Sequence, residues 1–262
     1  MLRSDPLKIT IDGIETEVEK ETTILQLAKK LGIEIPTLCH HDAISTYGAC
    51  RVCTVEVGIP RSGGGKRTRM VTACNYPIRD NGLNINTKSE RVLAVRKMIL
   101  ELLLARCPGV KRIQDMAKEY EITESRFPIE NPEEECILCG LCTRVCQEII
   151  GKSAISLVGR GFERKVLTPF DEPSEDCIAC GACAYVCPTG AIKIVQEDGK
   201  LTIKNWKTSR ELAKCLECGE YVGSEAVLQY IKERVSLPED IFKLCEKCRR
   251  KKLQKELITT GK

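Results

Sequence analysis

The chain has 262 residues, of which 30% are charged and only 4% are aromatic, so little material is available for one large apolar core. Its 17 cysteines are abnormal and restrict it to a secreted disulfide scaffold or a metal protein. The first residues contain no apolar run, and the longest apolar stretch, MILELLLA, is interrupted by Glu101. We therefore expect no secretory signal, no membrane insertion and a cytoplasmic, reduced protein whose paired cysteines bind metal.

The net charge of +4 is unevenly distributed along the chain. Residues 243–262 contain eight Lys or Arg against two Glu, which leaves the rest of the chain slightly acidic. A basic tail on a nearly neutral protein is not the pattern of a nucleic-acid-binding surface, and no nucleic-acid partner is expected.

The N-terminal stretch predicts a small sheet domain. Residues 7–18 alternate apolar and polar side chains around Asp12-Gly13, which is a strong signal for a two-residue β-hairpin. A helix is expected next, with Thr23 as its N-cap and Gln26 completing a capping box. The strand CRVCTVEVG follows, so the order is that of a ββαβ domain of the β-grasp type.

Four cysteines accompany these elements: Cys39, Cys50, Cys53 and Cys74. Plant-type ferredoxins also combine a central CxxC with one cysteine on each side, so the predicted cofactor is one [2Fe-2S] cluster. Because four cysteines are available, His40 and His41 are expected beside the site or on the surface and not as ligands. The segment IPRSGGGKRTR is expected to be a flexible basic loop, and it lacks the residues of a phosphate loop.

A long amphipathic helix is predicted over residues 89–107, leading out of the sheet domain. Cys107 lies at its end with no second cysteine nearby in the sequence. A single cysteine after an apolar helix is typical of a small buried hydrophobic residue, and we expect no ligand role for it.

Two runs, CILCGLCTRVC and CIACGACAYVCP, both read C-x2-C-x2-C-x3-C and follow similar acidic, proline-containing stretches, which indicates an internal duplication. In two-cluster ferredoxins the fourth cysteine of each run binds the other cluster. The first predicted [4Fe-4S] cluster is therefore held by Cys136, Cys139, Cys142 and Cys187. The second is held by Cys177, Cys180, Cys183 and Cys146. Gly140 and Gly181 leave room for the backbone to approach the inorganic sulfurs.

A third pattern, C-x2-C-x26-C-x2-C, consists of Cys215, Cys218, Cys245 and Cys248. Two CxxC knuckles at such a separation commonly form a closed, structural four-cysteine zinc site. A further Fe–S cluster is the alternative, because thiolates bind both.

These patterns predict an α+β protein of four parts. They are a [2Fe-2S] β-grasp domain (1–90), a helical linker (91–130), a ferredoxin-like domain with two [4Fe-4S] clusters (131–200), and a C-terminal four-cysteine metal module with a basic tail (201–262). Parts this small rarely hold together by apolar burial alone, so bound metal is expected to contribute much of their stability.

The stretch IPTLCHHDAISTYGACRVCTVEV with TACNYP, followed by the paired ferredoxin runs, resembles the N-terminal region of the large iron–sulfur subunit of respiratory complex I. It is equally similar to the diaphorase iron–sulfur subunits of NAD-linked hydrogenases and formate dehydrogenases. The family also has a His-plus-three-Cys [4Fe-4S] site after the long helix. Here RCPGVKRIQDMAKEY offers one cysteine and no histidine, so that cluster is not expected.

The resemblance implies a relay of single electrons between a flavin/NAD(H)-binding subunit and a hydrogenase module or soluble ferredoxin, in a hetero-oligomeric complex of the bifurcating or the non-bifurcating kind. The alternative is the same role in a formate dehydrogenase. A distant alternative is an Fe–S/zinc regulator that binds nucleic acid. No flavin, nicotinamide or nucleophile–base site is recognised, so we expect a non-catalytic subunit of an oxidoreductase complex.

Overall fold

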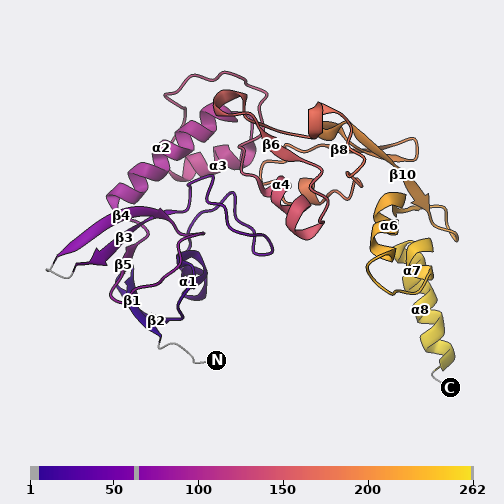
Figure 1. The fold of residues 1–262 in the computed structure, drawn as a ribbon, viewed down its shortest axis with the longest axis horizontal. Helices are drawn as coiled ribbons and strands as arrows, with labels where there is room; N and C mark the ends of the chain where they lie inside the picture. The colour runs from indigo at the N-terminus through magenta and orange to yellow at the C-terminus, as the bar shows by residue number, and fades with distance from the viewer. Residues whose placement is uncertain (1–5, 62–64, 261–262) are drawn as a thin grey trace. The chain divides into compact units, whose positions relative to one another are not determined.

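A computed structural model describes residues 6–61 and 65–260 of the chain (Figure 1). It forms two compact units, which are described separately below. The first contains residues 1–141 with 188–191, and the second contains residues 142–187 with 192–262. No described helix is both long enough and apolar enough to cross a lipid bilayer.

The first unit is built on a five-stranded sheet. Its strands are β1 (Leu7–Ile11), β2 (Ile14–Val18), β3 (Thr54–Pro60), β4 (Lys66–Thr72) and β5 (Asn84–Asn86). Their spatial order is β2-β1-β5-β3-β4, with β1 and β5 parallel and the other neighbours antiparallel. The predicted hairpin is confirmed, because Ile11 pairs with Ile14 across the Asp12-Gly13 turn.

Helix α1 (Ile24–Lys30) covers this sheet and begins where the sequence predicts. The Oγ1 atom of Thr23 accepts a hydrogen bond from the Gln26 amide at 3.2 Å, and Gln26 Oε1 accepts one from the Thr23 amide at 2.9 Å. Ile24 and Leu27 then point into a core shared with the inner faces of the strands. Hairpin, helix and sheet together confirm the β-grasp prediction.

The expected flexible loop between Cys53 and Cys74 is instead mostly a β-hairpin. Strands β3 and β4 pair from Thr54 opposite Thr72 as far as Pro60 opposite Lys66. The loop prediction for residues 59–69 is wrong over residues 59–60 and 66–69, because exposed antiparallel strands accommodate charged side chains on their solvent-facing side. The tip, residues 62–64, lies outside the described residues.

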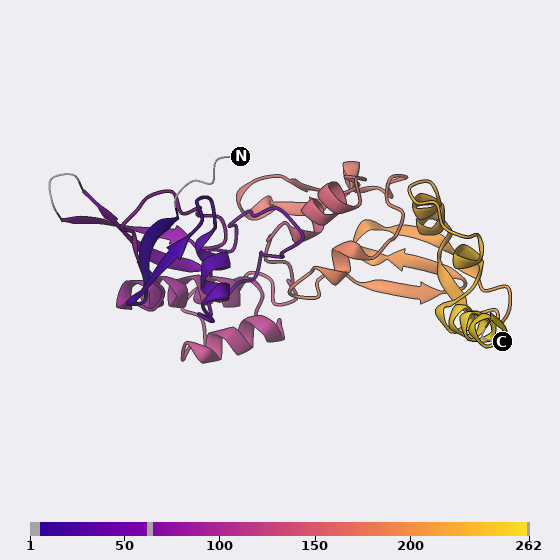
Figure 2. The ribbon, with the colours of Figure 1, turned by 90° about the horizontal axis from the view of Figure 1, so that it is seen from below.

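Helix α2 (Glu90–Arg106) confirms the predicted long helix and contacts β3 of the same unit (Figure 2). Ser89 is its N-cap, with Oγ accepting from the Val92 amide at 3.3 Å. Helix α3 (Lys111–Glu119) turns back against α2, and a small cluster containing Leu100 and Ala117 is buried between them.

In the second unit, short elements lie within and between the cysteine runs. They are η1 (Val145–Ile149), β6 (Ser156–Val158), η2 (Gly161–Glu163), β7 (Lys165–Leu167), η3 (Pro169–Asp171) and α5 (Ala182–Tyr185). Helix α4 (Leu141–Arg144) precedes η1 along the chain. Strands β6 and β7 form a hairpin of their own.

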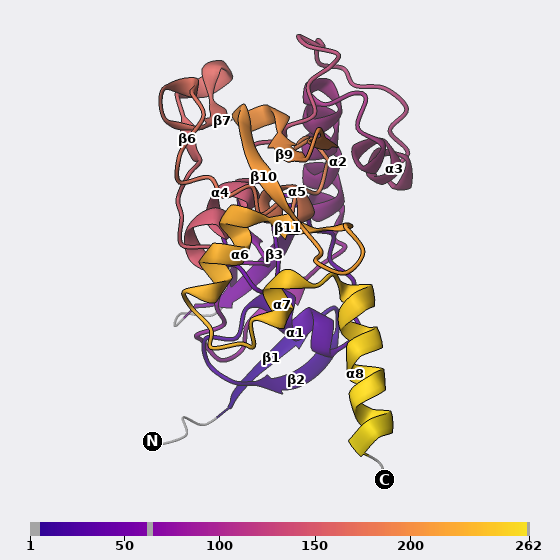
Figure 3. The same ribbon diagram turned by 90° about the vertical axis from the view of Figure 1, so that its right-hand side faces the viewer.

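A four-stranded antiparallel sheet completes the second unit. It contains β8 (Ile194–Glu197), β9 (Lys200–Ile203), β10 (Thr208–Lys214) and β11 (Tyr221–Ser224), in the order β11-β10-β9-β8. A single 3-10 turn, η4 (Lys204–Trp206), joins β9 to β10. Helix α6 (Glu225–Lys232) contacts β10 and β11, followed by α7 (Asp240–Lys243) and α8 (Glu246–Thr260) (Figure 3).

Candidate functional site

The four cysteines of the N-terminal unit come together beside the β-grasp sheet. Cys39, Cys53 and Cys74 are each 1% exposed, and Cys50 is also buried. The Cys50 amide donates to Cys39 Sγ at 3.4 Å. The thiols of Cys50 and Cys74 also hydrogen-bond Cys39, which lowers the pKa of Cys39 and raises theirs. These sulfurs are therefore close enough to share a cluster, where a metal would replace their protons.

Gly48 lets the loop before Cys50 approach its neighbours closely. Its backbone has φ +70°, and a Cβ atom there would lie 2.8 Å from Asn75 Nδ2 and 3.2 Å from Thr72 Oγ1. Asn75 and Thr72 are themselves hydrogen-bonded beside Cys74. The conformation of the loop around the cysteines therefore requires glycine at position 48, because any side chain there would collide with Asn75 and Thr72.

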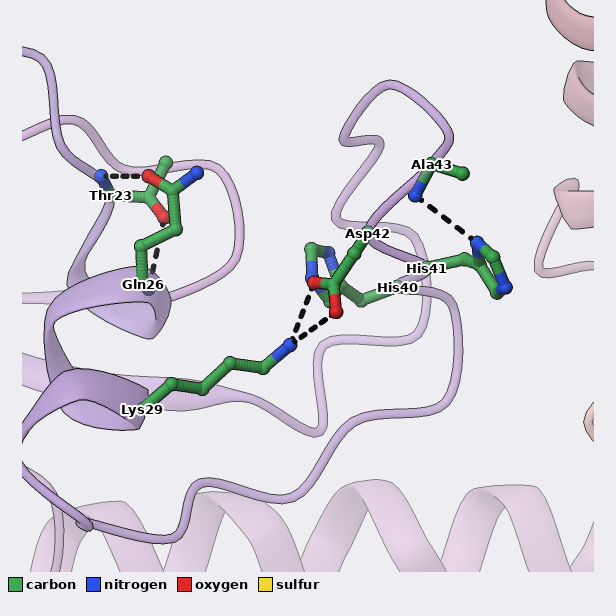
Figure 4. A network of polar contacts seen from close by, with 7 residues as sticks. All are labelled: Thr23, Gln26, Lys29, His40, His41, Asp42 and Ala43. Carbon is green, nitrogen blue, oxygen red and sulfur yellow. Dashed lines mark hydrogen bonds and ion pairs between the residues drawn. The ribbon is translucent and has the colours of Figure 1, made fainter.

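The two histidines that follow Cys39 have different hydrogen-bond partners (Figure 4). His40 Nε2 lies 3.0 Å from Asp42 Oδ1, and Lys29 Nζ of α1 lies 2.7 Å from the same oxygen. Lys29 and then His40 lower the pKa of the Asp42 carboxyl. His41 Nδ1 accepts a hydrogen bond from the Ala43 amide at 3.2 Å. The loop carrying Cys39 is thus tied to α1 by an ion pair.

The second nitrogen of His40, Nδ1, is buried and has no hydrogen-bond partner among the described residues. The side chain of His40 is only 11% exposed, so solvent reaches little of it. The sequence predicts that His40 lies beside the site or on the surface and is not a ligand. In the structure its other ring nitrogen, Nε2, contacts Asp42 Oδ1.

Cys107 is fully buried at the C-terminal end of α2. Its amide donates to the Leu103 carbonyl at 2.8 Å, and its carbonyl accepts from the Val110 amide at 3.2 Å. Burial, followed by the negative charge of Glu134, raises the pKa of the Cys107 thiol to about 12. The predicted burial is confirmed, and the thiol stays protonated near neutral pH.

The two ferredoxin runs have the same backbone at matching positions. Leu138 and Ala179 both have positive φ, 53° and 52°, and so do Gly140 and Gly181, 69° and 76°. Left-handed residues in a tight loop help to turn successive N–H groups to one side, which forms the anion-binding nest found at many Fe–S sites. The duplication seen in the sequence therefore extends to the conformation of both loops.

In the second unit, four predicted ligands line one cavity with about 350 Å³ of atom-free space. They are Cys146, Cys177, Cys180 and Cys183, and the enclosed part of the cavity measures about 20 Å³, the rest of the space being open to solvent. Cys177 and Cys183 are buried, whereas Cys180 is exposed. Ile203 at the end of β9 and Trp206 of η4 also line the cavity. Burial raises the pKa of Cys183 to about 11, and the Trp206 indole N–H opposes that rise.

The other predicted set is divided between the two units. Cys136 and Cys139 belong to the first unit, and Cys142 and Cys187 belong to the second. Within the first unit, Arg106 Nε donates to the Cys136 carbonyl at 2.8 Å, and the Cys136 amide donates to Glu134 Oε1 at 2.7 Å. This set stays a prediction from the sequence.

The C-terminal cysteines form a compact group. The sulfurs of Cys215, Cys218, Cys245 and Cys248 all lie within 4.8 Å of one another, and those of Cys218 and Cys245 are 3.6 Å apart. Cys215 directly follows β10, and Cys218 lies in the turn that leads to β11. Cys245 directly precedes α8, and Cys248 lies in its first turn. The Cys245 amide lowers the pKa of Cys215 to about 6, which favours the thiolate needed for metal binding.

Comparisons with known proteins agree with this geometry. Residues 4–90 match the family of 2Fe-2S iron-sulfur cluster binding domains, and residues 135–191 and 176–222 match the 4Fe-4S dicluster domain. The chain is an iron–sulfur protein. The predicted order of a [2Fe-2S] domain, a dicluster [4Fe-4S] domain and a C-terminal four-cysteine group is confirmed.

Relatives of this iron–sulfur protein include the NADPH-Fe(3+) oxidoreductase subunit alpha of Geobacter sulfurreducens, 36% identical over 59% of this chain and 20% of the relative. The NADH-ubiquinone oxidoreductase 75 kDa subunit of Reclinomonas americana is 31% identical over 62% of this chain and 26% of that subunit. The chain therefore spans about a quarter or less of these relatives. The predicted resemblance to iron–sulfur subunits of NAD-linked complexes is confirmed.

A solved structure of an NAD+-reducing [NiFe]-hydrogenase is also similar. One of its chains is 28% identical to this iron–sulfur protein, with a TM-score of 0.58. The match covers 76% of this chain and 87% of the hydrogenase chain.

Proposed function

We propose that this protein relays single electrons between a flavin/NAD(H)-binding subunit and a hydrogenase module, in a cytoplasmic hetero-oligomeric complex. The observation that carries the proposal is the match to nearly the whole length of one chain of an NAD+-reducing hydrogenase. A series of clusters in one chain is useful only between a donor and an acceptor, and the protein then supplies their positions and potentials. A bifurcating complex with soluble ferredoxin as third partner is a further part of the proposal.

The proposed ligands follow the cysteine sets. Cys39, Cys50, Cys53 and Cys74 hold the [2Fe-2S] cluster. The two [4Fe-4S] clusters are held by Cys136, Cys139, Cys142 and Cys187, and by Cys177, Cys180, Cys183 and Cys146. The shared cavity of the last four supports that set, and the linked thiols of Cys39, Cys50 and Cys74 support the first.

For the C-terminal group we propose zinc in a structural site. Four sulfurs around one tetrahedral ion with Zn–S bonds of about 2.3 Å lie about 3.8 Å apart. The 3.6 Å between Cys218 and Cys245, and the 4.8 Å limit for the whole group, fit that arrangement. A cubane binds its four thiolates on four different irons, which spreads the sulfurs more widely.

Metal and sulfide analysis of the anaerobically purified protein tests these assignments. We expect about ten iron and one zinc per chain, since two cubanes and one [2Fe-2S] cluster would be present. About fourteen iron without zinc would contradict the zinc assignment. The matched variants Cys180→Ser and Cys218→Ser separate the sites, because the first should lose iron only and the second zinc only.

The relay itself is tested by rapid mixing with NADH. Cluster absorbance should bleach when the flavoprotein that co-purifies with the native complex is present, and it should not bleach when the chain is alone. A native complex without a flavoprotein, or clusters that stay oxidised with it, would contradict the proposal. Tight DNA binding with a steep salt dependence would instead favour the nucleic-acid-binding regulator.

A further inference from the structure

Trp206 is the only tryptophan of the chain, and it contacts a proposed cluster ligand. The side chain is 4% exposed and lies in η4, the turn that joins β9 to β10. Its indole N–H donates a hydrogen bond to Cys183 Sγ at 3.4 Å. Both residues belong to the second unit, and both line the cavity formed by the four cysteines.

The turn that carries Trp206 is held in place from within the sheet. Thr208, which is fully buried, donates from Oγ1 to the Trp206 carbonyl at 2.9 Å. The next residue, Lys207, reaches Asp171 with an Nζ–Oδ2 distance of 2.7 Å. The backbone on both sides of the indole is therefore held by contacts within the second unit.

The same sheet is fastened to the loop that carries the cysteines. The buried Ser224 Oγ donates to the Ile178 carbonyl at 2.9 Å, one residue after Cys177. Arg210 Nη2 donates to the carbonyls of Ser174 and Glu175, each at 3.0 Å. The C-terminal sheet thus contacts the ferredoxin loop through backbone carbonyls as well as through the sulfur of Cys183.

A donor aimed at a thiolate sulfur affects the cluster that the thiolate binds. The potentials of Fe–S clusters depend on net charge, hydrogen bonds to sulfur and exposure to solvent. The reduced cluster carries one more negative charge, part of which resides on the sulfurs. An N–H donor stabilises that charge more strongly in the reduced state than in the oxidised state, and so it raises the potential.

We propose that Trp206 is a positioning residue that raises the reduction potential of the [4Fe-4S] cluster at Cys146, Cys177, Cys180 and Cys183. This inference rests on the ligand set of the proposed function. The inference gives the four-stranded sheet a role in electron transfer. The sheet brings a hydrogen-bond donor to the sulfur of Cys183.

Redox titration of the full chain, followed by EPR, tests the proposal with Trp206→Phe. Phenylalanine keeps an aromatic ring in the cavity wall but lacks the N–H. We expect the midpoint potential of one [4Fe-4S] cluster to become more negative. The equilibrium constant for its reduction should fall three- to tenfold, and a tenfold change corresponds to about 59 mV for one electron. Iron content and the other two midpoints should not change. Unchanged midpoints with full iron content would overturn the proposal.

Tyr185→Phe is the matched control. Tyr185 is on α5, in the same cysteine run, but its side chain is 86% exposed. Removing its hydroxyl should leave all three midpoints unchanged. If Tyr185→Phe shifts the same midpoint as Trp206→Phe does, the shift is a general response of the loop, and the proposed role of the indole N–H is wrong.

A measurement on the unaltered sequence avoids any folding defect of the variant. Because Trp206 is the only tryptophan, labelling with indole-¹⁵N tryptophan marks one nitrogen of the whole protein. A ¹⁵N hyperfine coupling should appear for one reduced [4Fe-4S] cluster and for no other. Absence of the coupling with both cubanes present overturns the role of Trp206 alone, whereas absence of the second cubane overturns the ligand set and this inference together.

Discussion

Individual cysteines of this chain differ in what their surroundings allow. Cys107 is fully buried with a raised pKa, whereas the Cys215 thiol is brought to a pKa of about 6 by a backbone amide. Metal binding replaces the thiol proton, so a raised pKa by itself does not exclude ligation, as the buried predicted ligand Cys183 shows. Cys107 differs from the predicted ligands in having no second cysteine nearby in the sequence.

The variant Cys107→Ser tests the role of the odd cysteine. We expect unchanged iron content and cluster spectra, since no cluster uses this thiol. Stability should fall by about 1–3 kcal/mol, because a buried hydroxyl without a guaranteed partner replaces a weakly polar thiol. Cys50→Ser is the contrasting variant and should lose the [2Fe-2S] signal. Loss of a cluster from Cys107→Ser would contradict the assignment.

A second residue-scale prediction concerns Gly48→Ala. The added Cβ would meet Asn75 at 2.8 Å in a backbone with φ +70°. The left-handed conformation alone costs about 1–2 kcal/mol for alanine. We expect a lower yield of the [2Fe-2S] cluster and faster loss of its visible absorbance on warming. Gly32→Asn serves as control, because Gly32 ends α1 in open space and asparagine tolerates that conformation. Equal behaviour of the two variants would disprove the steric argument.

Among the elements, α6 shows how one side chain can serve two purposes. Ser224 Oγ caps the helix by accepting from the Val227 amide at 3.2 Å, and it donates to the Ile178 carbonyl. The cap gives the helix its start, and the second bond attaches the helix and β11 to the cysteine loop. A serine before a helix indicates a cap in the sequence. The hydrogen bond to Ile178 joins residues 46 positions apart, so no local pattern predicts it.

We therefore expect Ser224→Ala to destabilise the second unit more than an ordinary cap would. Loss of the cap costs about 1 kcal/mol, and the lost bond to Ile178 about 1 kcal/mol more. For a unit of this size, each corresponds to roughly 2–8 °C in the thermal midpoint. Thr23→Ala, which removes the cap of α1, is the comparison, with circular dichroism as the measurement. An equal shift in both variants would contradict the double role.

For the whole molecule, the modules are small and their cores are local. The β-grasp core is the largest, whereas the C-terminal group is a cluster of three buried cysteines with Leu244. Such a cluster buries too little apolar surface to fold by itself, so a metal bound by the four cysteines would contribute folding free energy directly. The iron sites and the C-terminal site should therefore respond to different treatments.

A zinc-selective chelator should remove one metal ion and loosen residues 207–260, while iron content stays near ten per chain. Hydrogen exchange is the suitable measurement, and α6 and α8 should lose protection. The sheet also carries Trp206, so the potential of one cubane should fall as in Trp206→Phe. Unchanged exchange after complete zinc loss would show that the module folds without the ion.

The cysteine spacings predicted the [2Fe-2S] and [4Fe-4S] domains and their order, whereas alternation, turn residues and a capping box predicted the hairpin and α1. These signals can be read in the sequence because ligand spacing, turn chemistry and capping are encoded in short stretches of the chain. Tertiary structure decided that β3 and β4 extend into the expected loop as far as Pro60 and Lys66, since strand pairing accommodates the charged side chains there. It also decided that Trp206 meets Cys183. That contact joins residues 23 positions apart in the sequence, and only packing of the four-stranded sheet brings their atoms together.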